Sequence, residues 1–140
     1  MAKTTTLHDF LEQLIEMGGT FILRNEHGSM ELRGQDLYLH PYKEWLTVYH
    51  TNADRPEGRS HLHLKGQTLQ AAVVRRSEGE TPHLAFFKAG EPQGDPLLVW
   101  YFPSFYDWSQ GKALIPDNVT RFESFVEAYG EQVRFAEKAG

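Results

Sequence analysis

The sequence predicts an α+β fold in which a large curled antiparallel β-sheet is accompanied by an N-terminal and a C-terminal helix. Apolar residues recur at helical spacing near both ends of the chain, and short runs of alternating or β-branched residues fill its middle. Gly, Pro, Asn and Asp separate these runs. Because 140 residues is the length of one ordinary domain, we assign residues 1–140 to a single domain.

The two predicted helices are marked by apolar stripes and by the residues at their ends. The first covers residues 6–17, where Thr6 is suited to an N-cap and Gly18 to a stop. The second begins near Asp117 and ends or bends at Gly130. The stripes consist of Leu7, Phe10, Leu11, Leu14 and Met17 in the first helix, and Val119, Phe122, Phe125, Val126 and Tyr129 in the second.

About seven or eight antiparallel strands are predicted between the helices. The polar residues 25–29 join two apolar runs and indicate a hairpin. No fixed-period repeat is present. The last three predicted strands are expected to follow one another as a meander. The predicted strands cover residues 21–23, 30–33, 37–41, 45–51, 60–65, 69–76, 83–88 and 97–102.

Composition excludes several classes of function. The chain has no Cys, which removes disulfides, thiol nucleophiles and thiolate metal sites. The net charge of -5 disfavours a nucleic-acid partner. The longest apolar run is Leu97–Phe102, so we expect no signal peptide and no membrane insertion. We therefore expect a cytoplasmic protein.

Three of the seven histidines flank one predicted loop: His50 before it, and His61 and His63 after it. Strand alternation sends His61, His63 and Lys65 to one face of the sheet. Neutral imidazoles in this arrangement can bind a transition metal or a haem iron. The alternative is a solvated pair of histidines on an outer sheet face, which the pattern alone favours.

Two further groups of residues are candidates for contact with a ligand. Arg75 and Arg76 end a predicted strand on opposite faces, so one of the two guanidinium groups can reach a ligand carboxylate, although a solvated strand end is the commoner case. Trp100 and Phe102 share a face of the last predicted strand. They either complete the core or line a flat apolar cavity, and the core is the default expectation.

The order of features along the chain resembles the HemS/ChuX family of haem-utilisation carriers, in its short, single-unit form. An amphipathic helix that ends in Gly is followed by an aromatic strand, a His-Leu-Lys segment, a Phe-Phe strand, an aliphatic-aromatic strand and a final helix. Together these features span about nine tenths of the chain. The segments are Trp45–Thr51, with Val48 and His50 at the matching positions, His63–Lys65, Leu69–Val74, Phe86-Phe87, Leu97–Phe102 and Val119–Tyr129.

The resemblance implies a homodimer that holds haem through histidine, with basic side chains near the propionates. On this chain it implies His63 as the iron ligand and His50 as the second, with His61 in an assisting position. Lys65 and Arg75 are the candidate cations. The aromatic candidates for the porphyrin wall are Trp100 and Phe102.

We therefore expect a haem-binding and haem-trafficking protein that is not an enzyme. One alternative is a dimeric scaffold or chaperone-like module of the same fold. A further alternative is an enzyme that degrades haem or uses a His-bound iron with oxygen. Dimerisation is also expected on physical grounds, because two helices cannot cover both faces and both edges of a large sheet.

Overall fold

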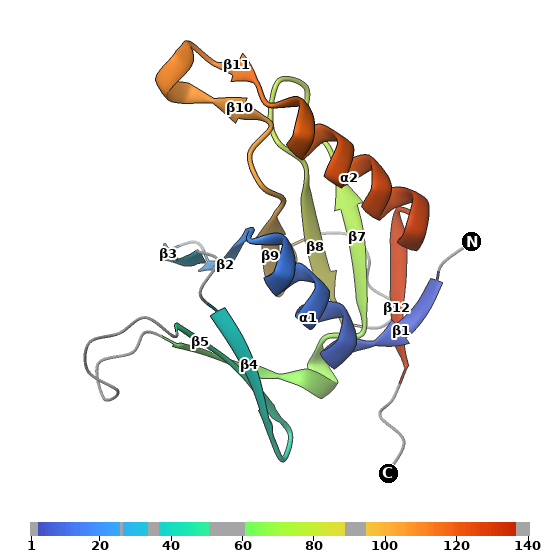
Figure 1. Cartoon of the computed structure of the whole chain (residues 1–140). Coiled ribbons are helices and arrows are strands. Elements are labelled where there is room, and N and C mark those ends of the chain that lie inside the picture. The colour runs from blue at the N-terminus through green and yellow to red at the C-terminus, as the bar shows by residue number, and fades with distance from the viewer. Residues whose placement is uncertain (1–2, 26, 34–36, 51–60, 89–94, 137–140) are drawn as a thin grey trace.

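The structure, a computed structural model, describes residues 3–25, 27–33, 37–50, 61–88 and 95–136 (Figure 1). Its helices are α1 (Leu7–Met17) and α2 (Pro116–Tyr129). Short 3-10 turns cover Gly66–Thr68 and Trp108–Gln110. The strands are β1 (Lys3–Thr6), β2 (Thr20–Asn25), β3 (Gly28–Arg33), β4 (Leu37–Tyr42), β5 (Trp45–His50), β6 (His61–Lys65), β7 (Ala71–Arg75), β8 (His83–Phe87), β9 (Leu98–Tyr101), β10 (Tyr106–Asp107), β11 (Ala113–Leu114) and β12 (Gln132–Ala136).

The strands form three sheets. A seven-stranded sheet has the order β1-β12-β7-β8-β9-β2-β3, a three-stranded sheet has the order β4-β5-β6, and β10 pairs with β11. All pairs are antiparallel except β1 with β12, which joins the two ends of the chain in parallel. The α+β class with two helices is confirmed, and the expected strands are divided between the larger two sheets.

The two helices lie over the same face of the seven-stranded sheet (Figure 1). Phe10 of α1 is fully buried and packs edge-on against Phe86 of β8 and Phe125 of α2. As expected, Thr6 caps α1 by accepting a hydrogen bond from the backbone N–H of Asp9, and Gly18 ends the helix in the left-handed conformation. One continuous core therefore lies between helices and sheet.

The three-stranded sheet packs its inner face against the same core. Leu39, Val48 and Leu64, one from each strand, are at most 9% exposed and belong to the cluster that contains the α1 stripe. Each side chain of this size contributes about 1.5–3 kcal/mol when fully buried. With the inner face occupied by apolar residues, the outer face of β4, β5 and β6 carries the polar and aromatic side chains.

The short hairpin of β10 and β11 projects away from both larger sheets (Figure 1). Trp108, in the connection between its strands, is 68% exposed. The ammonium of Lys112 lies 5.1 Å from the ring centre of Tyr106 and 5.2 Å from that of Trp108. The sequence did not predict this hairpin, because two-residue strands leave no periodic signal.

At Gly19 the backbone passes so close to the core that a larger residue does not fit. Trp100 is fully buried, and Gly19 lies directly against it at the start of β2. A Cβ at Gly19 would overlap both the carbonyl oxygen of Tyr101 and the indole of Trp100. Neither the backbone oxygen nor a ring sealed in the core can move away at low cost.

We predict that Gly19→Ala lowers the free energy of unfolding by about 2 kcal/mol or more, because it overpacks the core beside Trp100. The matched control is Gly28→Ala at the first residue of β3, where nothing lies within 4 Å of the added Cβ. Urea unfolding followed by tryptophan fluorescence measures both variants. Equal stability of the two variants would contradict the prediction.

Candidate functional site

The outer face of the three-stranded sheet carries three rows of three side chains, set by the register of β4, β5 and β6. Side chains of alternate residues share a face, and residues directly opposite on neighbouring strands form each row. We call this surface the histidine face. Its rows are Tyr38, Tyr49 and His61; His40, Thr47 and His63; and Tyr42, Trp45 and Lys65.

His63 lies exposed on the histidine face, and its ring is held by neighbours on several sides. Its Nδ1 lies 2.8 Å from the hydroxyl oxygen of Thr47. The ring centre of His61 lies 4.7 Å from that of His63, and the ring centre of Trp45 lies 6.3 Å from it; both rings are edge-on to His63. The predicted alternation is confirmed, since His61, His63 and Lys65 are exposed whereas Leu64 is buried.

A hollow of about 350 Å³ lies beside His63. Trp45, Leu23 of β2 and Leu97 line it together with His63. Lys65 contributes a cation to the same lining. The hollow thus combines an imidazole, apolar walls and an ammonium group, a combination suited to an apolar ligand that carries an acidic group.

The other predicted polar residues take different positions. His61 stands beside His63. The backbone of His50 pairs with Leu37, and the side chain of His50 lies outside the described residues. Arg75 lies on the seven-stranded sheet with its guanidinium 4.8 Å from the ring centre of Phe87, and it is not part of the lining beside His63.

Trp100 and Phe102 lie inside the core, where they are 0% and 3% exposed. Phe102 packs edge-on against Phe122 of α2, so the helices cover the face that these rings occupy. The expected aromatic wall is therefore not built from them in this arrangement. Trp45 and Leu97, which line the hollow, were missed because nothing in a single sequence tells which face of a strand the helices cover.

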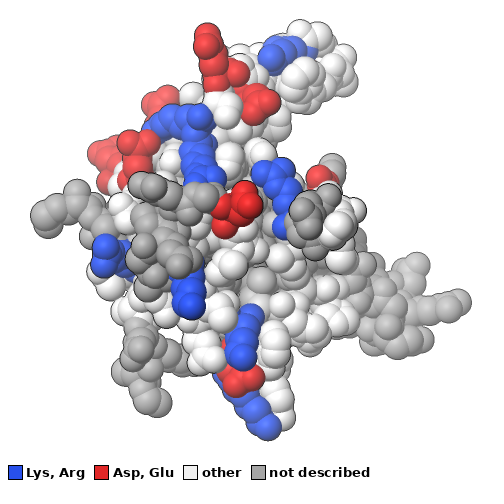
Figure 2. Space-filling view, turned by 180° about the vertical axis from the view of Figure 1, so that it is seen from behind, with Lys and Arg blue, Asp and Glu red and all other residues white. Residues whose placement is uncertain are grey.

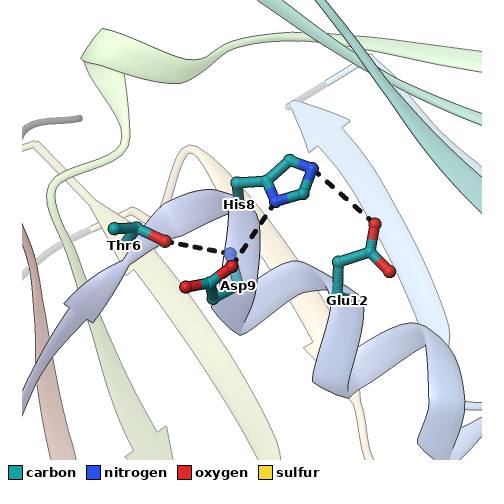
Figure 3. A network of polar contacts seen from close by, with 4 residues as sticks. All are labelled: Thr6, His8, Asp9 and Glu12. Carbon is teal, nitrogen blue, oxygen red and sulfur yellow. Dashed lines mark hydrogen bonds and ion pairs between the residues drawn. The ribbon is translucent and has the colours of Figure 1, made fainter. Parts of the chain in front are cut away.

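A larger hollow, of about 750 Å³, lies at the start of α1. Its lining includes His8, whose ring nitrogens face carboxylate oxygens of Asp9 at 3.6 Å and Glu12 at 3.7 Å (Figure 3). Both nitrogens of His8 are thus directed to acidic partners. We favour the smaller hollow as the functional site, because its imidazole, His63, contacts a neutral hydroxyl through Nδ1, whereas both ring nitrogens of His8 face carboxylates.

His83 is a half-buried histidine on the opposite face of the seven-stranded sheet from the helices. Its ring lies 4.9 Å from that of Tyr101. Burial lowers the pKa of His83 below 6.5, the positive charges of Arg75 and Arg24 lower it further, and Glu80 acts in the opposite direction.

Basic and acidic side chains are interspersed over the back of the molecule (Figure 2).

Comparison with known proteins shows the fold. No protein-family model and no curated protein matches the sequence. The solved structure of the heme binding protein ChuX aligns with a TM-score of 0.61 and 15% identity over 87% of this chain and 71% of ChuX. A protein from Agrobacterium tumefaciens aligns with a TM-score of 0.60 and 16% identity over 86% of this chain and 65% of that protein. A protein from Erwinia carotovora aligns with a TM-score of 0.59 and 15% identity over 87% of this chain and 73% of that protein.

The chain therefore has a ChuX-like fold, as the order of its features indicated. At about 15% identity, the likeness concerns the arrangement of the backbone and not the residues of a site. Neither helix of the described residues is long and apolar enough to cross a membrane.

We predict that His83 makes the protein less stable as the pH falls. Because its pKa is lowered in the folded state, the unfolded chain takes up the proton first, and stability declines below about pH 6.5 until the folded state is protonated as well. Between about pH 7.5 and about pH 5.5, His83→Gln is expected to lose less stability than the wild type. Parallel pH profiles in both proteins, measured by urea unfolding, would contradict this.

Proposed function

We propose that this protein binds haem on the histidine face, with the Nε2 atom of His63 as the iron ligand, and that it carries haem without transforming it. The observation that supports the proposal most directly is the placement of His63: an exposed imidazole, hydrogen-bonded through Nδ1, beside a hollow with apolar walls. Neutral imidazole is a common protein ligand of haem iron.

The donor set suits haem better than a bare metal ion. Among the residues that the structure describes, no three His, Cys, Asp or Glu side chains are grouped to hold a metal. A porphyrin supplies the in-plane ligands itself, so one imidazole from the protein is enough to anchor it. Trp45, Leu23 and Leu97 offer apolar contact to the macrocycle.

The residues expected around His63 have different roles in the proposal. Lys65 lines the hollow and is the cation placed to meet a propionate. His61 touches the ring of His63 and is proposed to assist. His50, the expected second ligand, is not proposed for this face, because alternation along β5 places position 50 on the other face from Thr47 and Tyr49. The cation expected at Arg75 is not proposed for this hollow, because Arg75 lies over Phe87 on the other sheet.

The ChuX-like fold supports a haem-related function, since ChuX itself is a heme binding protein. A carrier must release its cargo, and an open hollow with an exposed ligand histidine favours exchange over permanent retention. We further propose that the protein acts in the cytoplasm, in iron utilisation, and as a homodimer.

A second candidate function is that of a protein-interaction scaffold. The observation that favours it is the projecting β10–β11 hairpin, where Trp108 and Leu114 are 68% and 56% exposed. Apolar side chains in such a position are typical of contact surfaces between proteins. The scaffold candidate predicts indifference to haem, which separates it from the carrier.

We predict that haemin titrated into the protein gives the Soret band of a His-ligated haem, and that His63→Ala weakens binding by at least about tenfold. The matched control is His40→Ala. His40 is exposed on the same face, in the same row as His63 but on the other side of Thr47, and it is not part of the lining of the hollow. An unchanged spectrum in His63→Ala would exclude His63 as the ligand.

We also predict a homodimer in solution. The expected result of light scattering at micromolar concentration is a mass of twice the 16.1 kDa of the chain. The physical reason is the amount of sheet that two helices leave uncovered, together with the exposed Trp108. A monomer at that concentration would contradict this prediction.

A further inference from the structure

Thr47 occupies the centre of the histidine face and is itself hidden. It lies on β5, the middle strand, with His40 opposite on β4 and His63 opposite on β6. Although most of this face is exposed, the Thr47 side chain is only 4% exposed. It is the buried polar residue among the part of the chain that the structure describes.

A buried hydroxyl without a hydrogen-bond partner is costly, by about 1–3 kcal/mol. The partner of Thr47 is His63, whose Nδ1 lies 2.8 Å from Oγ1. The two residues are direct cross-strand neighbours, so the contact needs no displacement of either strand. The same contact restricts the rotation of the imidazole, which His61 and Trp45 also limit from their sides.

The hydroxyl also bears on which ring nitrogen carries the proton. If Nδ1–H donates to Oγ1, then Nε2 presents a lone pair; if the hydroxyl donates to Nδ1, then Nε2 carries the proton. Only the first arrangement leaves Nε2 able to ligate a metal. The partner that a ligating histidine meets through its second nitrogen fixes the tautomer in this way in metal proteins generally.

We infer that Thr47 is a positioning residue: it accepts a hydrogen bond from Nδ1–H of His63 and so holds Nε2 unprotonated and directed away from the sheet. The choice of this tautomer rests on the proposed function, because only a lone pair on Nε2 can ligate the haem iron. The acceptor is a neutral hydroxyl, which leaves the imidazole less electron-rich than a carboxylate acceptor would. A ligand of this strength suits a protein that passes its haem on.

The test uses the full chain with three variants. Thr47→Val keeps the shape of the side chain and removes the hydroxyl, and Thr47→Ser restores the hydroxyl. Thr20→Val on β2 is the matched control, a half-buried strand threonine away from the histidine face. The first readout needs no haem: long-range proton–nitrogen NMR reports which ring nitrogen of His63 carries the proton at mildly alkaline pH.

The expected result is a proton on Nδ1 of His63 in the wild type, in Thr47→Ser and in Thr20→Val. In Thr47→Val the proton is expected to shift toward Nε2. The second readout is haemin titration, in which Thr47→Val binds about tenfold more weakly than the wild type, and Thr47→Ser recovers the affinity. Rescue by Ser separates the hydrogen bond from a general loss of packing.

Each of three results would overturn the inference: a proton on Nε2 of His63 in the wild type, an unchanged tautomer in Thr47→Val, or, where the wild type binds haemin, an unchanged haemin affinity in Thr47→Val. The wild-type spectrum alone decides the first, even if Thr47→Val does not fold. If the tautomer is as inferred but the wild type binds no haemin, the proposed function fails and the positioning role stands. If His63→Ala loses haemin and Thr47→Val does not, the proposed function stands and the positioning role fails.

Discussion

The arrangement of the whole molecule depends on the burial of one helix. The apolar stripe of α1 packs against the seven-stranded sheet through Phe10, and against the inner face of the three-stranded sheet, where Val48 is fully buried. Because both sheets bury apolar side chains against α1, separating either sheet from this helix would expose a large apolar area to water. The outer face of β4, β5 and β6 is what this packing leaves open, and the histidines lie there.

In the three-stranded sheet, one face packs into the core and the other carries the candidate binding residues. Leu62 and Leu64 face the core, whereas His61, His63 and Lys65 alternate with them toward the outside. A change on one face can therefore alter ligand contact with little effect on the core. Thr47 is the exception, since its hydroxyl is buried and yet belongs to the outer face.

A shared fold at low identity does not choose the function. The ChuX-like fold leaves the ligand open, because the residues of a site and not the backbone arrangement decide what is bound. What supports the proposed haem ligand is the local chemistry: an exposed imidazole in the lining of the hollow, an aromatic ring and aliphatic side chains beside it, and Lys65 at the same hollow. The larger hollow at α1 lacks such an imidazole, since His8 faces two carboxylates.

The sequence by itself determined the helices, most strands and the outward direction of His61 and His63, because hydrophobic periodicity and caps such as Thr6 act over a few residues. It did not determine β1, β12 or the β10–β11 hairpin, which are too short or too polar to leave a pattern. Only the tertiary structure decided that Trp100 is core and that Trp45 and Leu97 border His63. Those contacts join residues far apart in the chain, and which face the helices cover is set by packing rather than by local spacing.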